Sequence, residues 1–242
     1  MRLTVIGCSP AWPNAGGAQS GYLVEGDGRR LLLDCGPGVL ARLRANQGGW
    51  PQVDAVAITH FHLDHWGDLV PWVWGLQFGP AAELPPPRLH VPPGGRETLA
   101  RRGEDHGQRD MFERAFEIAE YADGETFEIG GARLTPHRVL HYQMLAFGFR
   151  ISDNGSTLAY SGDSGPSDAL ATLARDADVF VCEATLAVTN PEGGTRGHLS
   201  AEEAEDAFRR SGAKRLLLTH RPSERPLANG FEQVYDGFEL EL

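Results

Sequence analysis

The segment Thr59-His60-Phe61-His62-Leu63-Asp64-His65 places three histidines and one aspartate within six consecutive residues. It begins where the apolar run 53–59 ends, and such a run is typical of a strand buried on both faces. Because alternate side chains of an extended segment project to the same side, we expect His60 and His62 to reach one metal ion. Asp64 and His65 lie beyond the turn and are placed to reach a second ion. A solvated loop that happens to be rich in histidine is the alternative, and burial against the strand disfavours it.

Two ions require more ligands than this segment offers, and further candidates stand where later strands are predicted to end. Asp163 follows the predicted strand 157–160, His141 follows the run 138–140, and His220 ends the run 216–220. Taken singly, each would suit a structural role at a turn or strand end. Together with the first cluster they complete a ligand set for two divalent ions. Imidazole and carboxylate ligands without thiolate favour Zn²⁺, with Mn²⁺ or Fe as alternatives.

The rest of the chain alternates short apolar runs with glycine-rich turns and amphipathic stretches. We predict strands at 3–6, 21–25, 30–33, 53–59, 88–91, 126–129, 132–135, 147–151, 157–160, 179–182, 215–218 and 238–242. Helices are expected after Pro37 and over 96–119 (interrupted by the polar stretch 103–110), 167–174 and 201–210. Strands followed by helices in each half predict an α/β fold of two stacked sheets with helices outside, in a single domain covering residues 1–242.

Composition excludes several classes of protein. The net charge of 22 − 33 = −11 argues against an extended binder of nucleic acid, which normally presents a basic face. The three cysteines are widely spaced and form no CxxC motif, so we expect a reducing, cytoplasmic setting without disulfides. The first residues lack the apolar length of a signal peptide, and no apolar run is long enough to span a membrane.

The HxHxDH pattern, together with Asp163 and His220, resembles the metallo-β-lactamase fold, and within it the phosphodiesterase branch that includes ribonuclease Z. The resemblance covers nearly the whole chain, from the segments 7–10 and 31–36 to His220. It implies a four-layer αββα sandwich in which Asp34 supports a ligand. It also implies that His60, His62 and His141 bind one metal ion, that Asp64, His65 and His220 bind the other, and that Asp163 bridges the two with a water or hydroxide. In this scheme Asp64 counts as a catalytic residue as well as a ligand.

Two further segments, Cys182-Glu183-Ala184-Thr185 and Gly197-His198-Leu199-Ser200, look like the Glu-Ala-Thr and His-Ser/Thr elements of that branch. Hydrolysis of a phosphodiester needs a group that protonates the leaving alkoxide, and a histidine held by a carboxylate can do so. We therefore assign His198 as the catalytic acid and Glu183 as the partner that keeps it charged and oriented. Under the alternative, Glu183 only ends a strand and His198 only precedes a helix. Ser200 is expected to cap that helix within a capping box.

The chain departs from ribonuclease Z in ways that bear on the substrate. Asp163 follows His141 by only 163 − 141 = 22 positions, which leaves no room for a long tRNA-binding arm. Five residues lie between His141 and Phe147, where the family typically has four, so His137 competes with His141 as a ligand. The segment 221–225 also differs from the Ser-x-Arg-Tyr type common in that branch. We therefore predict a dinuclear metal-dependent phosphodiesterase that acts on small phosphodiesters or cyclic nucleotides, and we do not expect nucleic acid as its substrate.

Three alternatives remain open. The first is a ribonuclease Z-like tRNA 3′ endonuclease, and the second is a hydrolase of lactones, thioesters or sulfate esters on the same fold. The third is a metal-bound interaction module without activity. The segment 68–78 is apolar all round, with Trp72 and Trp74 on different faces of a helix. The loop 79–95 could cover the second face, but we expect a homodimer interface there.

Overall fold

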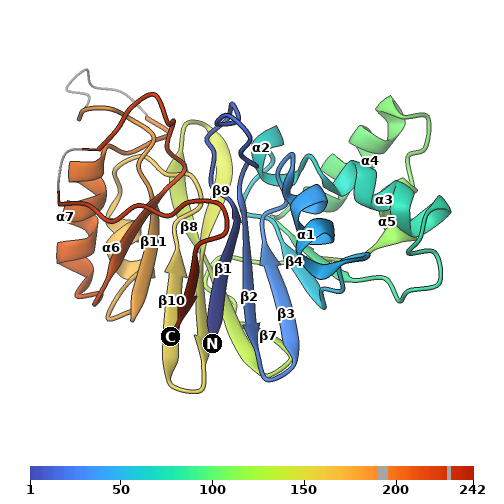
Figure 1. The fold of residues 1–242 in the computed structure, drawn as a ribbon, viewed down its shortest axis with the longest axis horizontal. Coiled ribbons are helices and arrows are strands. Elements are labelled where there is room, and N and C mark those ends of the chain that lie inside the picture. Colours follow the sequence, from blue (N-terminus) through green and yellow to red (C-terminus); the bar gives the residue numbers. More distant parts are fainter. Residues whose placement is uncertain (190–195, 228–229) are drawn as a thin grey trace.

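Two β-sheets pack face to face and helices cover their outer surfaces in the computed structural model, which describes residues 1–189, 196–227 and 230–242 (Figure 1). One sheet has seven strands in the order β13-β1-β2-β3-β4-β5-β6, and the other has six in the order β12-β11-β10-β9-β8-β7. Helices α1 to α5 lie on the side of the first sheet, and α6 and α7 on the side of the second (Figure 1). The predicted αββα sandwich is therefore confirmed.

The strands of the first sheet are β1 Arg2–Gly7, β2 Gly21–Gly26, β3 Arg29–Leu33, β4 Ala55–Ala57, β5 Arg88–Val91, β6 Glu117–Glu120 and β13 Glu239–Glu241. Those of the second are β7 Phe127–Ile129, β8 Ala132–His141, β9 Met144–Asp153, β10 Ser156–Tyr160, β11 Val179–Glu183 and β12 Leu216–Thr219. The helices are α1 Val39–Gln47, α2 Leu63–Trp66, α3 Leu69–Phe78, α4 Gly95–Asp105, α5 Met111–Ala115, α6 Asp168–Leu173 and α7 Ala201–Ser211.

Strand β3 shows how the sequence creates three apolar layers. Its alternate residues Leu31 and Leu33 face the core between the two sheets, whereas Leu32 faces the core beneath α1 and α3. Strand β11 does the same on the other side, with Val181 between the sheets and Phe180 beneath α6 and α7. A strand segment buried on both faces is expected to be apolar, and residues 31–33 of β3 and 179–182 of β11 are.

The structure corrects three predicted elements. Residues 117–119, expected to be helical, belong to the edge strand β6, which pairs in parallel with β5. The buried strand before the histidine cluster is shorter than expected, Ala55–Ala57 instead of 53–59. Strand β8 continues through Pro136 to His141. Proline is tolerated there because β7 pairs only with residues 132–134, so the missing N–H of Pro136 removes no hydrogen bond from the ladder between β7 and β8.

Helix α3 has one buried face and one partly covered face. Leu69, Trp72 and Val73 are buried, while Trp74 stacks on Phe78 with ring centroids 5.9 Å apart. The Nε2 amide of Gln77 donates a hydrogen bond to the Met111 carbonyl at 2.8 Å, and the Ala81 N–H donates to the Gly75 carbonyl at 3.2 Å, so α5 and the loop 79–95 both contact this helix. The homodimer stays a prediction. In the described residues no helix has the length and apolar character needed to cross a membrane.

Candidate metal centre

The histidine-rich segment lies at the end of β4, where the chain turns into the short helix α2. Backbone bonds fix this turn, because the Cys35 N–H donates to the His65 carbonyl at 2.7 Å and the Ser20 N–H to the Asp64 carbonyl at 3.2 Å. Gly36 permits this approach, since a Cβ at that position would lie 2.0 Å from the Asp64 carbonyl oxygen. The sequence Asp34-Cys35-Gly36 thus holds the ligand segment rigidly against the first sheet.

The predicted ligands gather into two groups that share one carboxylate. His60, His62, His141 and Asp163 each offer a nitrogen or oxygen atom within 4.8 Å of the others, and so do Asp64, His65, Asp163 and His220. Asp163 follows β10 and His220 follows β12, so both sheets contribute. His137, the alternative to His141 as a ligand, lies earlier on the same strand β8 and belongs to neither of these groups.

Three buried atoms at the centre of this arrangement have no hydrogen-bond partner: His60 Nε2, His65 Nε2 and Asp163 Oδ1. Leaving such atoms unpaired is costly, and convergent nitrogen and carboxylate ligands are what a divalent metal ion requires. Burial holds the pKa of His60 well below its ordinary value, so its imidazole is neutral and able to ligate. The residues present therefore fit metal ions.

The charge on Asp163 is maintained although its side chain is buried. Burial by itself would raise the pKa of this carboxyl, but the neighbouring His220 and His65 hold it well below its ordinary value. The Asp163 Oδ1 atom lies 3.3 Å from His65 Nε2 and 3.5 Å from His220 Nε2. An ionised carboxylate at the junction of the two groups is suited to contact ions on both sides.

Other side chains orient the ligands. Asp34 lies 2.7 Å from His65 Nδ1 and accepts hydrogen bonds from the Thr59 and Tyr160 hydroxyls at 2.9 and 2.8 Å. This agrees with the supporting role that the resemblance implied for Asp34. Because Nδ1 of His65 is engaged with Asp34, its Nε2 is left to face the metal site.

Thr185 plays the corresponding part for His220, with its hydroxyl 2.8 Å from Nδ1 of that ring. His141 Nδ1 lies 2.7 Å from the Gly197 carbonyl, which directs Nε2 inward. Sequence reasoning did not assign roles to Thr59, Tyr160 or Thr185. Only Thr185 carried a usable signal, since it stands two residues after Glu183 in the segment already singled out.

Glu183 and His198 meet beside the metal groups. His198 Nδ1 lies 2.8 Å from Glu183 Oε1 and 3.9 Å from Asp163 Oδ2. Glu183 is fully buried and also accepts hydrogen bonds from the N–H groups of Ser164 at 3.1 Å and Thr185 at 3.0 Å. Ser200 caps α7 in a capping box with Glu203, as predicted. Burial opposes a charge on His198, but the Glu183 carboxylate raises its pKa to about 9.

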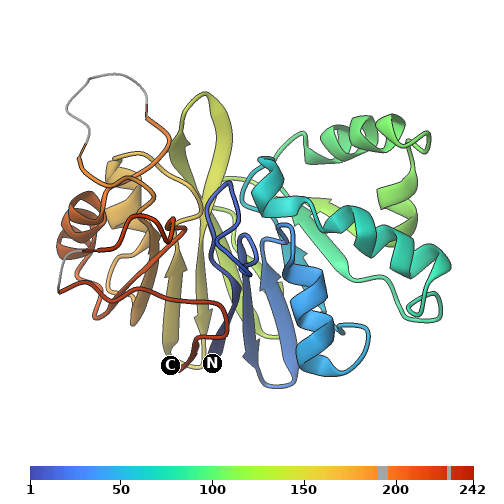
Figure 2. The same cartoon turned by 45° about the horizontal axis from the view of Figure 1, so that its top comes forward.

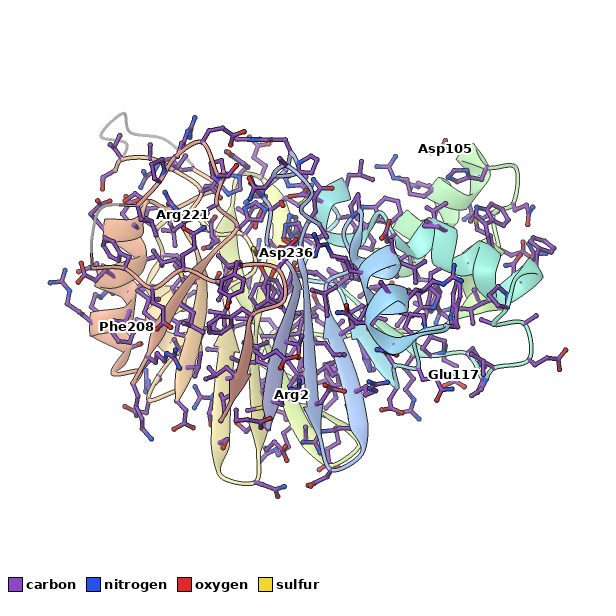
Figure 3. The ribbon with its side chains drawn as sticks, in the orientation of Figure 1. Arg2, Asp105, Glu117, Phe208, Arg221 and Asp236 are labelled. Carbon is purple, nitrogen blue, oxygen red and sulfur yellow. The ribbon has the colours of Figure 1, made fainter. Side chains whose placement is uncertain are left out.

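All these groups lie at one end of the stacked sheets. Figures 1 and 2 show α2 and the turn between β8 and β9 at the upper end of the molecule. Figure 3 places Arg221, which directly follows His220, toward this end, and Arg2 toward the other. The convergence of strand ends from two sheets explains why residues far apart in the sequence form one site.

The chain is similar to several curated proteins over most of its length. It is 34% identical over 226 residues to the uncharacterized protein ML1173 of Mycobacterium leprae, covering 92% of this chain and 78% of that protein. It is 30% identical to the probable metallo-hydrolase YhfI of Bacillus subtilis, covering 92% and 87% of the two chains. It is also 30% identical to ribonuclease Z of Mycobacterium bovis, covering 91% and 85%.

Solved structures agree with this relationship. The crystal structure of YhfI from Bacillus subtilis superposes with a TM-score of 0.82 at 25% identity, covering 99% of both chains. A diphosphatase of the PhnP family superposes with a TM-score of 0.77 at 21% identity, covering 100% of this chain and 97% of that one, and shows the fold alone. The family model described as "Beta-lactamase superfamily domain" matches residues 29–221. With this match and these relatives, the chain belongs to the beta-lactamase superfamily, as a metallo-hydrolase related to ribonuclease Z.

Proposed function

We propose that this protein is a dinuclear metal-dependent phosphodiesterase that hydrolyses small phosphodiesters, cyclic nucleotides among them. The observation that carries the proposal is the Glu183–His198 pair at the edge of the ligand groups, with His198 Nδ1 2.8 Å from Glu183 Oε1. An alkoxide is a poor leaving group and needs a proton, whereas a thioester or an activated lactone needs one much less. A protonated imidazole in this place favours a phosphodiester.

Each of the two ligand groups would bind one metal ion. His60, His62 and His141 would hold one ion, Asp64, His65 and His220 the other, and Asp163 would contact both. Bound there, two divalent ions would supply charge neutralisation for the phosphate oxygens and a water of lowered pKa as nucleophile, with Zn²⁺ the ion that these ligands favour. Asp64 contributes as one of these ligands, which is the sense in which we count it among the catalytic residues.

His198 holds the proton that the leaving oxygen requires. Its Nδ1 is engaged with Glu183, so the proton on Nε2 is the one available for transfer. Its side chain is 16% exposed, while that of Glu183 is fully buried, so substrate can reach the imidazole but not the carboxylate. Glu183 is therefore a positioning residue that keeps His198 protonated, and His198 is the general acid.

The arginines near the site support a small substrate. Arg196 is paired with Glu203, and the buried Arg221 donates to the carbonyls of Ala184 and Arg225. Each guanidinium group thus already has a partner within the protein. Together with a net charge of −11, this arrangement favours a substrate with one phosphate over an extended polyanion such as tRNA.

The experiment is a metal assay on the purified protein followed by a panel of substrates: a cyclic nucleotide, bis-p-nitrophenyl phosphate, a lactone, a thioester, a sulfate ester and a tRNA precursor. We expect about two transition-metal ions per chain and hydrolysis of the two phosphodiesters. Opening of lactones with no phosphodiester activity would overturn the proposal in favour of a hydrolase of lactones, thioesters or sulfate esters. Metal binding without any turnover would favour an interaction module.

A further inference from the structure

Four two-residue turns connect antiparallel neighbours in the described residues, and three follow the usual chemistry. They are Asp27-Gly28 between β2 and β3, Gly130-Gly131 between β7 and β8, and Asn154-Gly155 between β9 and β10. Both residues of each turn have positive φ, which suits glycine, asparagine and aspartate. These three turns lie together at the end of the sheets remote from the metal centre, where Asn154 Nδ2 donates to Asp27 Oδ2 at 2.6 Å.

The fourth turn, between β8 and β9, breaks this rule at the metal centre. It consists of Tyr142 and Gln143, and Tyr142 has φ 48°. A bulky residue in the left-handed region is uncommon and costs stability, and glycine or asparagine would adopt this conformation more easily. Residues that violate a local preference without structural gain are found mainly at functional sites.

The position of the Tyr142 ring explains what such a residue could do. It follows the ligand His141 directly, and its ring centroid lies 5.7 Å from that of His198 at an interplanar angle of 81°. It rests on Gly197, where an added Cβ would lie 2.2 Å from a ring carbon. The residue is nevertheless 48% exposed, so its ring is only partly covered by the protein.

We propose that Tyr142 is a substrate-binding residue whose ring stacks on a planar ring carried by the ester group of the substrate, as a nucleobase would be. The inference rests on the proposed phosphodiesterase function and narrows its substrate class. Stacking on aromatic side chains tolerates any base, since every base presents a π face. A ring standing beside the general acid would place the base close to the phosphate, within the span of one nucleotide.

The test compares a cyclic phosphodiester that carries a base, a purine cyclic nucleotide, with one that carries neither base nor ribose, glycerol 1,2-cyclic phosphate. The measured quantity is the preference, the ratio of kcat/KM for the nucleotide to kcat/KM for the glycerol ester. We expect Tyr142→Leu and Tyr142→Gly to lower this preference by roughly 5- to 100-fold, mainly through KM for the nucleotide. Tyr142→Phe should retain it, and Tyr235→Leu, at an exposed tyrosine outside the site, serves as the matched control.

Thermal unfolding separates binding from a structural role. Because glycine relieves the positive φ, Tyr142→Gly should melt at the same temperature as the wild type or higher, with the same metal content. A lower melting temperature with loss of metal, or an equal loss of activity on both substrates, would overturn the inference while leaving the phosphodiesterase intact. If the wild type hydrolyses neither substrate, the proposed function fails, and this inference fails with it.

Discussion

At the end of the sheets remote from the metal centre, positive φ angles belong to glycine, asparagine and aspartate in turns such as Asp27-Gly28 and Asn154-Gly155, whereas at the metal end Tyr142 and His220 adopt them as well. The two ends also differ in whether their buried polar groups are paired. Arg29 forms a buried ion pair with Asp153 and donates to the Gly130 carbonyl at 2.9 Å, which ties three turns together. At the metal end, His60 Nε2, His65 Nε2 and Asp163 Oδ1 are buried without partners.

This contrast distinguishes an end whose residues serve stability from an end whose residues serve chemistry. At the remote end, the buried ion pair is made within the protein, and the turns use residues that adopt positive φ easily. The metal end retains unpaired ligands and strained residues, which is a cost to the folded state that bound ions and substrate are placed to offset. Substitutions at the two ends should therefore separate function from folding.

The largest effect is expected from Asp163→Ala. Two cations held a few ångströms apart repel each other strongly, and the shared carboxylate is the ligand that makes the pair tolerable. The variant should lose metal and measurable turnover together. Elemental analysis and phosphodiester hydrolysis are the measurements, with Asp168→Ala, at an exposed residue of α6, as the control. Full turnover with two ions retained would show that Asp163 is not a ligand.

A smaller effect is expected when a residue that orients a ligand is altered. Asp34→Asn weakens the contact with His65 Nδ1, which measures 2.7 Å, and Thr185→Val removes the hydroxyl beside His220 Nδ1. Each should reduce metal affinity or activity by roughly 10- to 100-fold. Titration with added metal should restore much of the activity. Asp54→Asn provides the comparison, since Asp54 precedes β4 at the remote end and its carboxylate accepts a hydrogen bond from the Arg30 N–H at 2.6 Å. An equal loss there would contradict a role specific to the metal centre.

The pH profile of Glu183→Gln tests whether Glu183 keeps the general acid His198 protonated. His198 acts in its protonated form, and with a pKa of about 9 it keeps its proton until the pH rises through that value. On the alkaline side, the wild-type rate should therefore fall as the pH rises through about 9. Without the carboxylate, burial alone lowers the pKa, so the alkaline limb should move down by about 1–3 pH units. A limb that stays in place would show that Glu183 does not set the charge of His198.

Arg29→Met should leave metal content and turnover unchanged, which makes it the smallest effect on activity. Its effect on folding is large, because the Asp153 carboxylate is left buried and unpaired, at a cost of about 3–5 kcal/mol in the free energy of unfolding. Urea denaturation measures this loss. The double variant Arg29→Met/Asp153→Leu should regain part of it. Loss of turnover in the folded variant would mean that the two ends are coupled.

Much of this architecture could be predicted from the sequence because its signals are local. The apolar runs, the glycine-bounded turns and the HxHxDH segment identify the sheets and the first ligands by periodicity and spacing. Strand β6 was missed because Glu117–Glu120 lies on a sheet edge, where polar side chains hide the alternation of a strand. Tyr142 was missed because its meaning depends on a turn geometry and on contact with Gly197, 55 residues away in the sequence. Thr59 and Tyr160 were missed for the same reason, since only the folded chain brings them to Asp34.

The most direct test of the central claim is the dependence of the His198→Ala defect on the leaving group. For a cyclic nucleotide, whose ribose oxygen leaves as an alkoxide, loss of the acid should lower the rate on the order of 10²–10⁴-fold. For p-nitrophenyl esters, whose leaving group departs without a proton, the loss should be far smaller, with metal content unchanged. If His198→Ala slows both kinds of ester equally, His198 is not the general acid and the account fails.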